Sequence, residues 1–398
     1  MKIEVAKRDL EAALQVVSIS AASTGSDLTT HFVFRTNEDT VEVLSNNGRL
    51  GASAPFIARI EGEGSFTIES WRLNKWIAAV EDAALTLEHK DNAVIATAPK
   101  GSVKFQSLDP STFPYWDDQY GETEEGIKIA AKRFHAALSH AKMFISDKDT
   151  TNPTLAVTEI PEESAALQAT DKGALAVVTL QRATTTTNEE GEEVTTYTPE
   201  MTASNLRIHG KDLSQVLSFL STCGDEGVEL REHDRALFLL REDGSILNIG
   251  RPRHAFPELG LDDQSEKDPH WWTLKTQDIK SAIGALAASA PREERRIRFT
   301  AADNMVAMRM ASASGSKNIL HLEPLDSGSL DDATEMPDDG FEIAYPYLLN
   351  LLSQHKGDTL TFGLNPQVDD KGKHRGGWTR FRETRENDDF LTLLVWLI

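Results

Sequence analysis

The chain has 398 residues, of which 39% are hydrophobic and 26% charged, a composition that predicts a folded chain of about two to four domains. The longest apolar run, residues 393–398, is too short to span a bilayer, and the single cysteine, Cys223, excludes an internal disulfide framework or a cysteine-based zinc site and favours a reducing cytoplasm. With 41 basic and 63 acidic side chains the net charge is −22, which disfavours a protein that holds nucleic acid through its overall charge.

Amphipathic helices are predicted at regular intervals along the chain. Phe134, Leu138 and Ala141, for example, recur at the spacing of one helix face. The six predicted helices span residues 5–22, 69–82, 130–146, 209–223, 275–290 and 344–356.

Short strands are predicted after the second helix of each pair. Residues 84–89 and 93–97 flank a turn at Lys90-Asp91-Asn92, residues 228–232 and 236–240 flank His233-Asp234-Arg235, and residues 359–364 open a matching segment. Asp243-Gly244 is a tight-turn signal. The polar segments 182–200 and 367–377 interrupt this order, and the first of them is predicted to be an extended hairpin tip or a mobile loop.

Two similar boundaries divide the chain into thirds. Phe113-Pro114 and Phe256-Pro257 each precede an acidic, polar stretch, which is typical of a domain end followed by a linker. We therefore predict an α+β protein of three repeated domains, residues 1–120, 127–259 and 269–398, each with two helices packed on antiparallel sheet. Coincidence among common patterns is the alternative, and the paired boundaries argue against it.

Positive charge is concentrated on the predicted helices, which carry a net charge of +4 while the rest of the chain carries −26. One interpretation is a helical surface that faces a polyanion. The other is that helices simply favour lysine and arginine over aspartate.

Catalytic motifs are absent from the sequence. There is no phosphate-binding glycine loop, no His-Glu-x-x-His helix and no Gly-x-Ser-x-Gly elbow, and no carboxylate pair stands out as a general acid and base. We therefore predict no catalytic residue, no metal site and no cofactor, and favour a binding or scaffold protein over an enzyme. The alternative is an acidic α+β hydrolase that uses a carboxylate pair, which would leave the repeat unexplained.

Several stretches together carry a resemblance to a known family. They are residues 1–5 with Leu10, Leu14 and Val17, the two Phe-Pro domain ends, the strand Ala169-Thr170-Asp171 with Leu175-Ala176-Val177, and residues 341–352. In register along the whole chain, they resemble the β subunit of bacterial DNA polymerase III, the sliding clamp. The resemblance implies three clamp domains per chain and a head-to-tail homodimer that closes into a ring around duplex DNA. A trimeric clamp with two domains per chain is the alternative ring, and three repeats favour the dimer.

The resemblance also implies functional residues. Helices of such a ring line the hole, and the candidate DNA-binding residues are Arg72, Lys75, Lys132, Arg133, Lys142, Lys211, Lys275, Lys280 and Lys356. The dimer interface would join Phe105 and Leu108 of the first domain to Ala288 and Ser289 of the third. The ring would tether the replicative polymerase in the cytoplasm and confer processivity, without sequence preference on DNA.

A pocket for a short peptide of the polymerase or the clamp loader is implied between the second and third domains. Its residues would be Thr170, Gly173, Ala174, Leu175, Pro257, Val395, Trp396, Leu397 and Ile398. The apolar end of the chain is otherwise interpreted as a buried final strand. Two departures from the family pattern, Lys172-Gly173-Ala174-Leu175 and the ending Val395-Trp396-Leu397-Ile398, predict a more apolar pocket, and the divergent first domain is consistent with a bacteriophage source.

Overall fold

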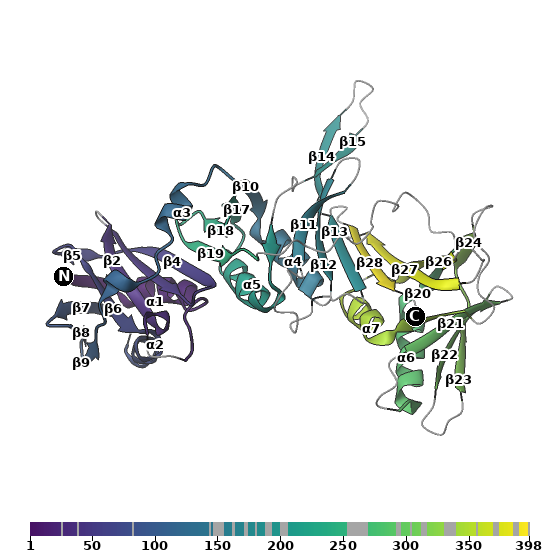
Figure 1. Cartoon of the computed structure of the whole chain (residues 1–398), viewed down its shortest axis with the longest axis horizontal. Coiled ribbons are helices and arrows are strands. Elements are labelled where there is room, and N and C mark those ends of the chain that lie inside the picture. The colour runs from purple at the N-terminus through teal and green to yellow at the C-terminus, as the bar shows by residue number, and fades with distance from the viewer. Residues whose placement is uncertain are drawn as a thin grey trace. The chain divides into compact units, whose positions relative to one another are not determined.

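The computed structural model (Figure 1) describes most of the chain. The described residues are 1–24, 27–37, 40–81, 83–142, 145, 155–160, 164–170, 174–179, 181–187, 193–199, 206–252, 270–291, 296–302, 305–311, 317–329, 340–355, 357–368, 374–384 and 390–396. The chain divides into two compact units, Met1–Ala136 with Leu206–His254, and Ala137–Asn205 with Ala255–Ile398. Because the division falls inside the second predicted domain, the three domain boundaries stay a prediction.

The first repeat begins with a strand that the sequence analysis missed. Ile3 and Val5 are buried while Lys2 and Glu4 are half-exposed, so the period is that of a strand and the first helix begins at Lys7 rather than at residue 5. The elements are β1 (Lys2–Ala6), α1 (Lys7–Val17), β2 (His31–Asn37), β3 (Thr40–Asn46), β4 (Leu50–Ile57), β5 (Arg59–Glu61), β6 (Ser65–Glu69), α2 (Ser70–Ala79), β7 (Ala84–Lys90), β8 (Ala93–Ala98) and β9 (Gly101–Gln106).

Helix α1 shows how the helices cover the sheets. Leu10, Leu14 and Val17 are buried at helical spacing and face β3 and β4. The helix ends where Ser18 Oγ donates to Leu14 O over 2.7 Å, several residues before the predicted end at residue 22. A short connection with α3 (Asp117–Gly121) follows the first repeat.

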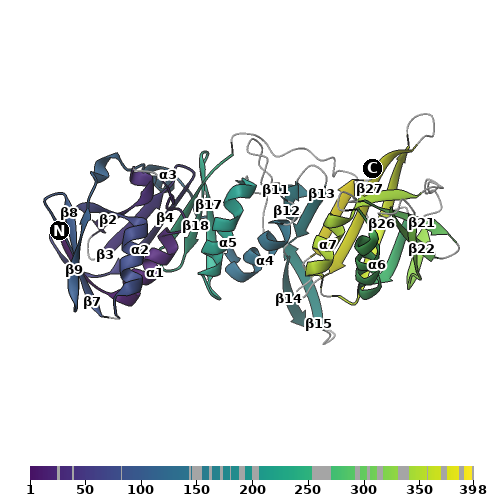
Figure 2. The same cartoon turned by 90° about the horizontal axis from the view of Figure 1, so that it is seen from below.

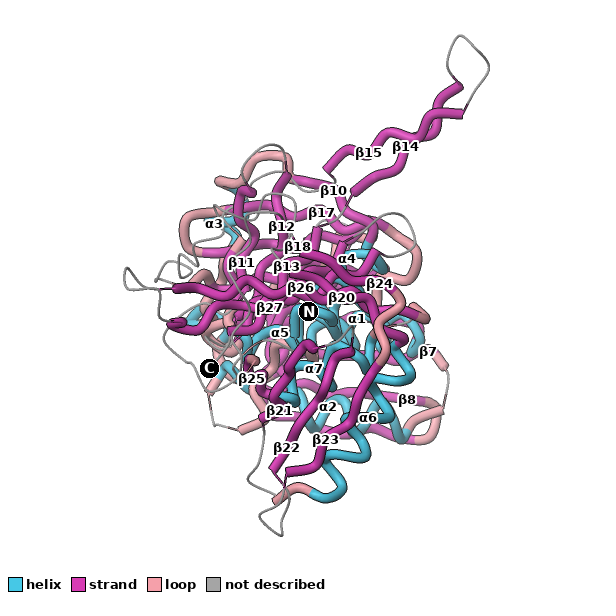
Figure 3. Tube along the Cα trace, turned by 90° about the vertical axis from the view of Figure 1, so that its right-hand side faces the viewer, coloured by secondary structure: helices cyan, strands magenta, loops and turns pink. Residues whose placement is uncertain are grey.

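The second repeat has the same order of elements with one addition. Its elements are β10 (Ile127–Ala130), α4 (Ala131–Lys142), β11 (Leu155–Ile160), β12 (Ser164–Thr170), β13 (Ala174–Thr179), β14 (Gln181–Thr187), β15 (Glu193–Pro199), β16 (Arg207–Ile208), α5 (Leu213–Ser221), β17 (Gly227–Glu232), β18 (Ala236–Arg241) and β19 (Ile246–Gly250). The polar segment that begins at residue 182 forms the hairpin of β14 and β15, as predicted, and this hairpin extends away from the other strands (Figure 3).

The third repeat closes the chain. Its elements are β20 (His270–Lys275), α6 (Thr276–Ser289), β21 (Arg296–Ala302), β22 (Met305–Ala311), β23 (Lys317–Leu322), β24 (Asp326–Ser329), β25 (Phe341–Ala344), α7 (Tyr345–Gln354), β26 (Thr359–Val368), β27 (His374–Thr384) and β28 (Phe390–Trp396). All six predicted helices and the predicted hairpins are therefore present, so the α+β class with two helices per repeat is confirmed.

The strands form antiparallel sheets, and several helices gather on one side of each unit (Figure 2). In the first unit the sheets run β5-β1-β7-β8-β9 and β10-β17-β18-β19-β4-β3-β2-β6, and in the second unit one sheet runs β11-β12-β13-β28-β27-β26-β20-β24 and another β23-β22-β21-β25. Figure 2 shows α1, α2 and α5 on a common side of the first unit, and α6 and α7 together on one side of the second. Part of each unit is therefore a helical surface.

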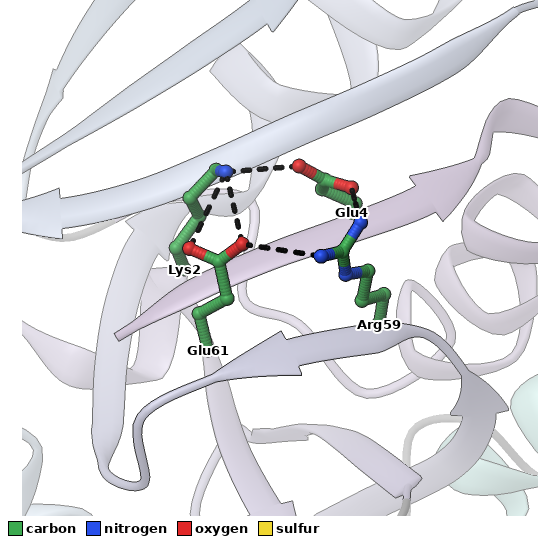
Figure 4. Close-up of polar contacts among 4 residues, drawn as sticks. All are labelled: Lys2, Glu4, Arg59 and Glu61. Atoms are coloured by element: carbon green, nitrogen blue, oxygen red, sulfur yellow. Dashed lines mark hydrogen bonds and ion pairs between the residues drawn. The ribbon is translucent and has the colours of Figure 1, made fainter.

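The β5 edge of the sheet β5-β1-β7-β8-β9 carries charged side chains. Lys2 lies opposite Glu61 and Glu4 lies opposite Arg59, and Figure 4 shows the four side chains in one cluster, with Lys2 Nζ 2.9 Å from Glu4 Oε1 and Arg59 Nη1 3.7 Å from Glu4 Oε2. The hydrogen bond from Lys2 lowers the pKa of the Glu4 carboxyl. Charged side chains along an edge strand discourage a further strand from pairing with it. The β5 edge is thus protected.

Candidate junctions, helical surface and peptide groove

Two strand pairings join one repeat to the next. β4 of the first repeat pairs with β19 of the second, and β13 of the second pairs with β28 of the third, both antiparallel. In the first junction Ala52 lies opposite Leu247, and in the second Ala176 lies opposite Leu393.

These two pairs occupy equivalent positions of the repeat. In each repeat the residue two before the first helix (Val5, Ile129 or Leu274) pairs with Leu85, Val228 or Leu360. From these partners we move two residues along the strand and then follow the pairings across the next two strands. In the three repeats this path leads to Val103 in β9, Leu247 in β19 and Leu393 in β28. β9, β19 and β28 are therefore counterparts.

The opposite side of the junctions can be traced in the same way. Phe66 and Phe341 each stand four residues before the second helix, and they pair with Phe34 and Phe299. The ladders then lead from Phe34 to Ala54 in β4 and from Phe299 to Leu320 in β23. Two residues back on each strand, Asn318 is the counterpart of Ala52.

β9 and β23 correspond to junction strands, but each lies at the edge of its own sheet. β9 is the edge strand opposite β5, and β23 is the edge strand opposite β25. Each presents an exposed apolar side chain, since Val103 and Ile319 are both 42% exposed. Leu247, the counterpart of Val103, is 0% exposed in its junction. The unpaired edges of β9 and β23 therefore correspond to the two strands that pair in each internal junction.

The predicted dimer-interface residues lie beside these edges, with one exception. Phe105 in β9 packs edge-on against Trp76, with ring centroids 6.3 Å apart, and Ala288 is exposed near the end of α6. Ser289 Oγ accepts from Asn318 Nδ2 of β23 over 2.6 Å. Leu108 instead follows β9, where its backbone N–H donates to Thr67 Oγ1 over 2.7 Å and its side chain packs against the cluster that contains Phe113 and Trp116. Val103 and Ile319 were missed because exposure on an edge strand depends on pairings distant in sequence.

The candidate DNA-binding residues lie on or next to the helices. Arg72 and Lys75 are on α2, Lys132, Arg133 and Lys142 on α4, Lys211 just before α5, Lys275 just before α6 and Lys280 in the first half of α6, while Lys356 lies outside the described residues. Arg72, Lys75, Lys132, Lys142 and Lys275 are exposed, and the other three are half-buried. Lys132 forms an ion pair with Asp225.

The exposed face of α2 also carries an aromatic side chain. Trp71 is 53% exposed, the Arg72 guanidinium lies 5.2 Å from its ring centroid, and Arg72 Nε lies 2.6 Å from Glu69 Oε2. Between α1 and α2 runs a groove of about 530 Å³ whose lining includes Arg8, Gln15 and Asn74. Arg8 was not among the candidate DNA-binding residues of the sequence analysis.

The second junction brings together those predicted peptide-pocket residues that the structure describes. Thr170 is buried and lies opposite Leu175, Leu175 lies opposite Leu394, and Ala174 lies opposite Val395. Trp396 follows on β28 and lies opposite Trp378 of β27. Gly173, Pro257, Leu397 and Ile398 lie outside the described residues. Adjacent strands thus place the N-terminal end of β13 beside the end of β28.

Asp212 is the one buried carboxylate in the described part of the chain, and its Oδ1 lies 3.0 Å from Arg49 Nη2. Burial raises the pKa of this carboxyl. Among the residues that the structure describes, no group of three or more histidine, cysteine or acidic side chains could hold a metal ion.

The solved structures that are most similar to this chain are all of one kind. The chain superposes over its full length on the DNA polymerase III β subunits of Caulobacter crescentus (TM-score 0.79, 14% identity, 100% of that chain), Pseudomonas aeruginosa (0.79, 12%, 100%) and Thermotoga maritima (0.75, 13%, 99%). No family model matches the sequence, and no curated protein matches it. The fold is therefore that of the DNA polymerase III β sliding clamp, and these structures give no support to a hydrolase.

Proposed function

We propose that the protein is a DNA sliding clamp, a ring that encircles duplex DNA and tethers a replicative polymerase without catalysing a reaction itself. The observation that carries this proposal is the shared register of the two internal junctions, together with the two edges, β9 and β23, that have the same build. A chain that joins its own repeats by this pairing can join a second copy in the same way.

The repeat gives the register of the intermolecular junction. By analogy with Ala52 and Leu247, Val103 of one chain lies opposite Asn318 of the other, and Ser102 lies opposite Ile319. Two such junctions, related by a twofold axis, close a head-to-tail dimer of six repeats. Pairing would cover the exposed parts of Val103 and Ile319, which is the hydrophobic contribution to association.

DNA contact in this proposal is made by the helices. A closed ring is held by topology, so the lysines and arginines of α2, α4 and α6 need only loose contacts with phosphates, which carry no sequence information. The net charge of −22 is compatible with this arrangement, since strong attraction would hinder sliding.

The junction of β13 and β28 is the proposed site for a peptide of the polymerase or of a clamp loader. The strand ends that meet there carry Leu175 and Trp396. A peptide with apolar anchors is the proposed ligand, because tryptophan is a frequent hot-spot residue of binding sites. The cytoplasm is the proposed compartment. Among the described residues, none of the helices combines the length and the apolar character that a membrane crossing requires. The bacteriophage source stays a prediction.

A cysteine pair tests the proposed junction. Val103→Cys and Asn318→Cys in one chain should give, on oxidation, a covalent dimer of twice the 43.9 kDa chain mass, because directly opposite strand residues are within disulfide reach. The matched control replaces Asn318→Cys with Leu322→Cys, which lies four residues farther along β23, at roughly 13 Å. Equal cross-linking of both pairs, or a monomer at micromolar concentration in sedimentation, would contradict the proposal.

A further inference from the structure

The first junction is covered by a segment of the chain itself, residues 113–120. Phe113 and Trp116 are only 4% and 5% exposed. They form one cluster with Leu28, Val33 and Leu44 of the first repeat and with Ala236 and Phe238 of the second. The segment therefore lies across the β4–β19 pairing and contacts both of its sides.

Trp116 occupies a place that a glycine leaves open. A Cβ atom on Gly51 would lie 2.6 Å from the indole ring of Trp116, which is closer than any ordinary contact. Gly51 lies opposite Asn248 in the β4–β19 pairing. The indole thus sits directly over the strand pairing, as an anchor side chain of a bound peptide would.

Polar and aromatic contacts hold the remainder of the segment. Asn46 Nδ2 donates to the carbonyl of Pro114 over 2.7 Å, and Arg35 Nη1 donates to Asp117 Oδ2 over 3.1 Å. The ring of Tyr120 lies edge-on to Phe238, with centroids 5.5 Å apart. A side-chain amide on a peptide carbonyl, an arginine on a carboxylate and an aromatic pair are the contacts by which grooves hold peptides from other proteins.

The covered residues correspond to those of the proposed peptide groove. Asn46 pairs with Gly51, five positions later in the sequence, and Thr170 pairs with Leu175, also five positions later. Across the junctions, Gly51 lies opposite Asn248 and Leu175 lies opposite Leu394. The counterparts of Thr170, Leu175 and Trp396 are therefore Asn46, Gly51 and Gly250.

We propose that the β4–β19 junction is a second peptide groove, whose ligand, an aromatic and acidic peptide, is supplied by the chain's own residues 113–120. The occupancy of this groove by residues 113–120 does not rest on the proposed function.

Removal of the anchor tests the proposal. Trp116→Ala should leave an apolar cavity that free indole fills, since engineered cavities bind apolar molecules of matching shape. Indole at millimolar concentration should raise the Tm of this variant by several degrees and leave the wild type unchanged. A synthetic peptide of residues 113–120 should bind the variant with one more site per chain than the wild type. Trp71→Ala, at an exposed tryptophan, is the matched control and should gain neither effect.

The outcomes separate this proposal from the clamp proposal. If Trp116→Ala gains no indole stabilisation and no additional peptide site, the second groove is refuted, whatever the state of the dimer. If Trp116→Ala does not fold, Gly51→Leu is used in its place, because its side chain should displace residues 113–120 from the groove. Chymotrypsin should then cleave after an aromatic residue between Tyr115 and Tyr120 in an otherwise folded chain. Protection of these sites in Gly51→Leu would likewise overturn the proposal. If the protein is a monomer and its Trp116→Ala variant still binds indole, only the clamp proposal is refuted.

Discussion

Val103→Ala is the substitution that tests the proposed intermolecular junction most economically. In the single chain Val103 is 42% exposed on the β9 edge, while its counterpart Leu247 is 0% exposed in the β4–β19 junction. Dimerisation should therefore bury the remaining exposed surface of Val103. Substitution by alanine removes this gain and leaves the strand ladder in place.

The size of the effect follows from the buried area. Val103→Ala removes two methyl-sized groups, each worth about 0.8 kcal/mol when it is fully buried. Since 42% of the residue is still exposed before association, the loss is about 0.7 kcal/mol per junction. Two junctions give about 1.3 kcal/mol, which is about a tenfold increase in the dimer Kd.

Sedimentation equilibrium over a range of concentrations would measure this Kd. Ile57→Ala is the matched control, because Ile57 is 80% exposed at the end of β4, and neither β9 nor β23 contains it. We expect the control to leave the Kd unchanged. An unchanged Kd for Val103→Ala, or an equal shift for both variants, would refute the assignment of β9 to the interface.

Three further predictions concern DNA, the cysteine and the end of the chain. Replacement of Lys132, Arg133 and Lys142 by glutamate should weaken duplex binding and flatten its salt dependence while the Tm changes little, and sequence-specific binding to linear DNA would contradict the proposal. Burial raises the pKa of the Cys223 thiol to about 11, so at pH 8 only about 0.1% is thiolate; a thiol reagent should react slowly with the folded protein and rapidly in denaturant, and fast native labelling would contradict the buried position. Deletion of residues 396–398 should abolish binding of a polymerase-derived peptide and leave the dimer intact, and Trp396→Ala should cost about 2 kcal/mol or more of peptide affinity, whereas unchanged affinity would move the site elsewhere.

Much of the secondary structure could be predicted because its signals are local. The six helices show apolar side chains at helical spacing, and the turn at Asp91 and Asn92 needs residues that tolerate positive φ, here 51° and 57°. The strands before the first helices were harder to predict. β1, for example, has only two buried residues, and Val5 also fits the period of the helix that follows.

The candidate interfaces depend on contacts between distant parts of the chain. The Phe-Pro repeat predicts the end of the first domain, but nothing in the sequence indicated that Trp116 packs over Gly51. That contact follows from the pairing of β4 with β19, which is not a local property. Likewise, the helical charge excess could be counted from the sequence, but the stacking of Arg72 on Trp71 required the structure.

The most direct test of a ring that encircles DNA is topological. The Val103→Cys, Asn318→Cys protein would be mixed with nicked circular plasmid under reducing conditions, oxidised, and washed at 1 M salt, where phosphate contacts are screened. A closed ring should stay on the circle and should be released when a restriction enzyme linearises the DNA. Equal retention on circular and linear DNA, or complete loss from both after efficient cross-linking, would contradict the clamp.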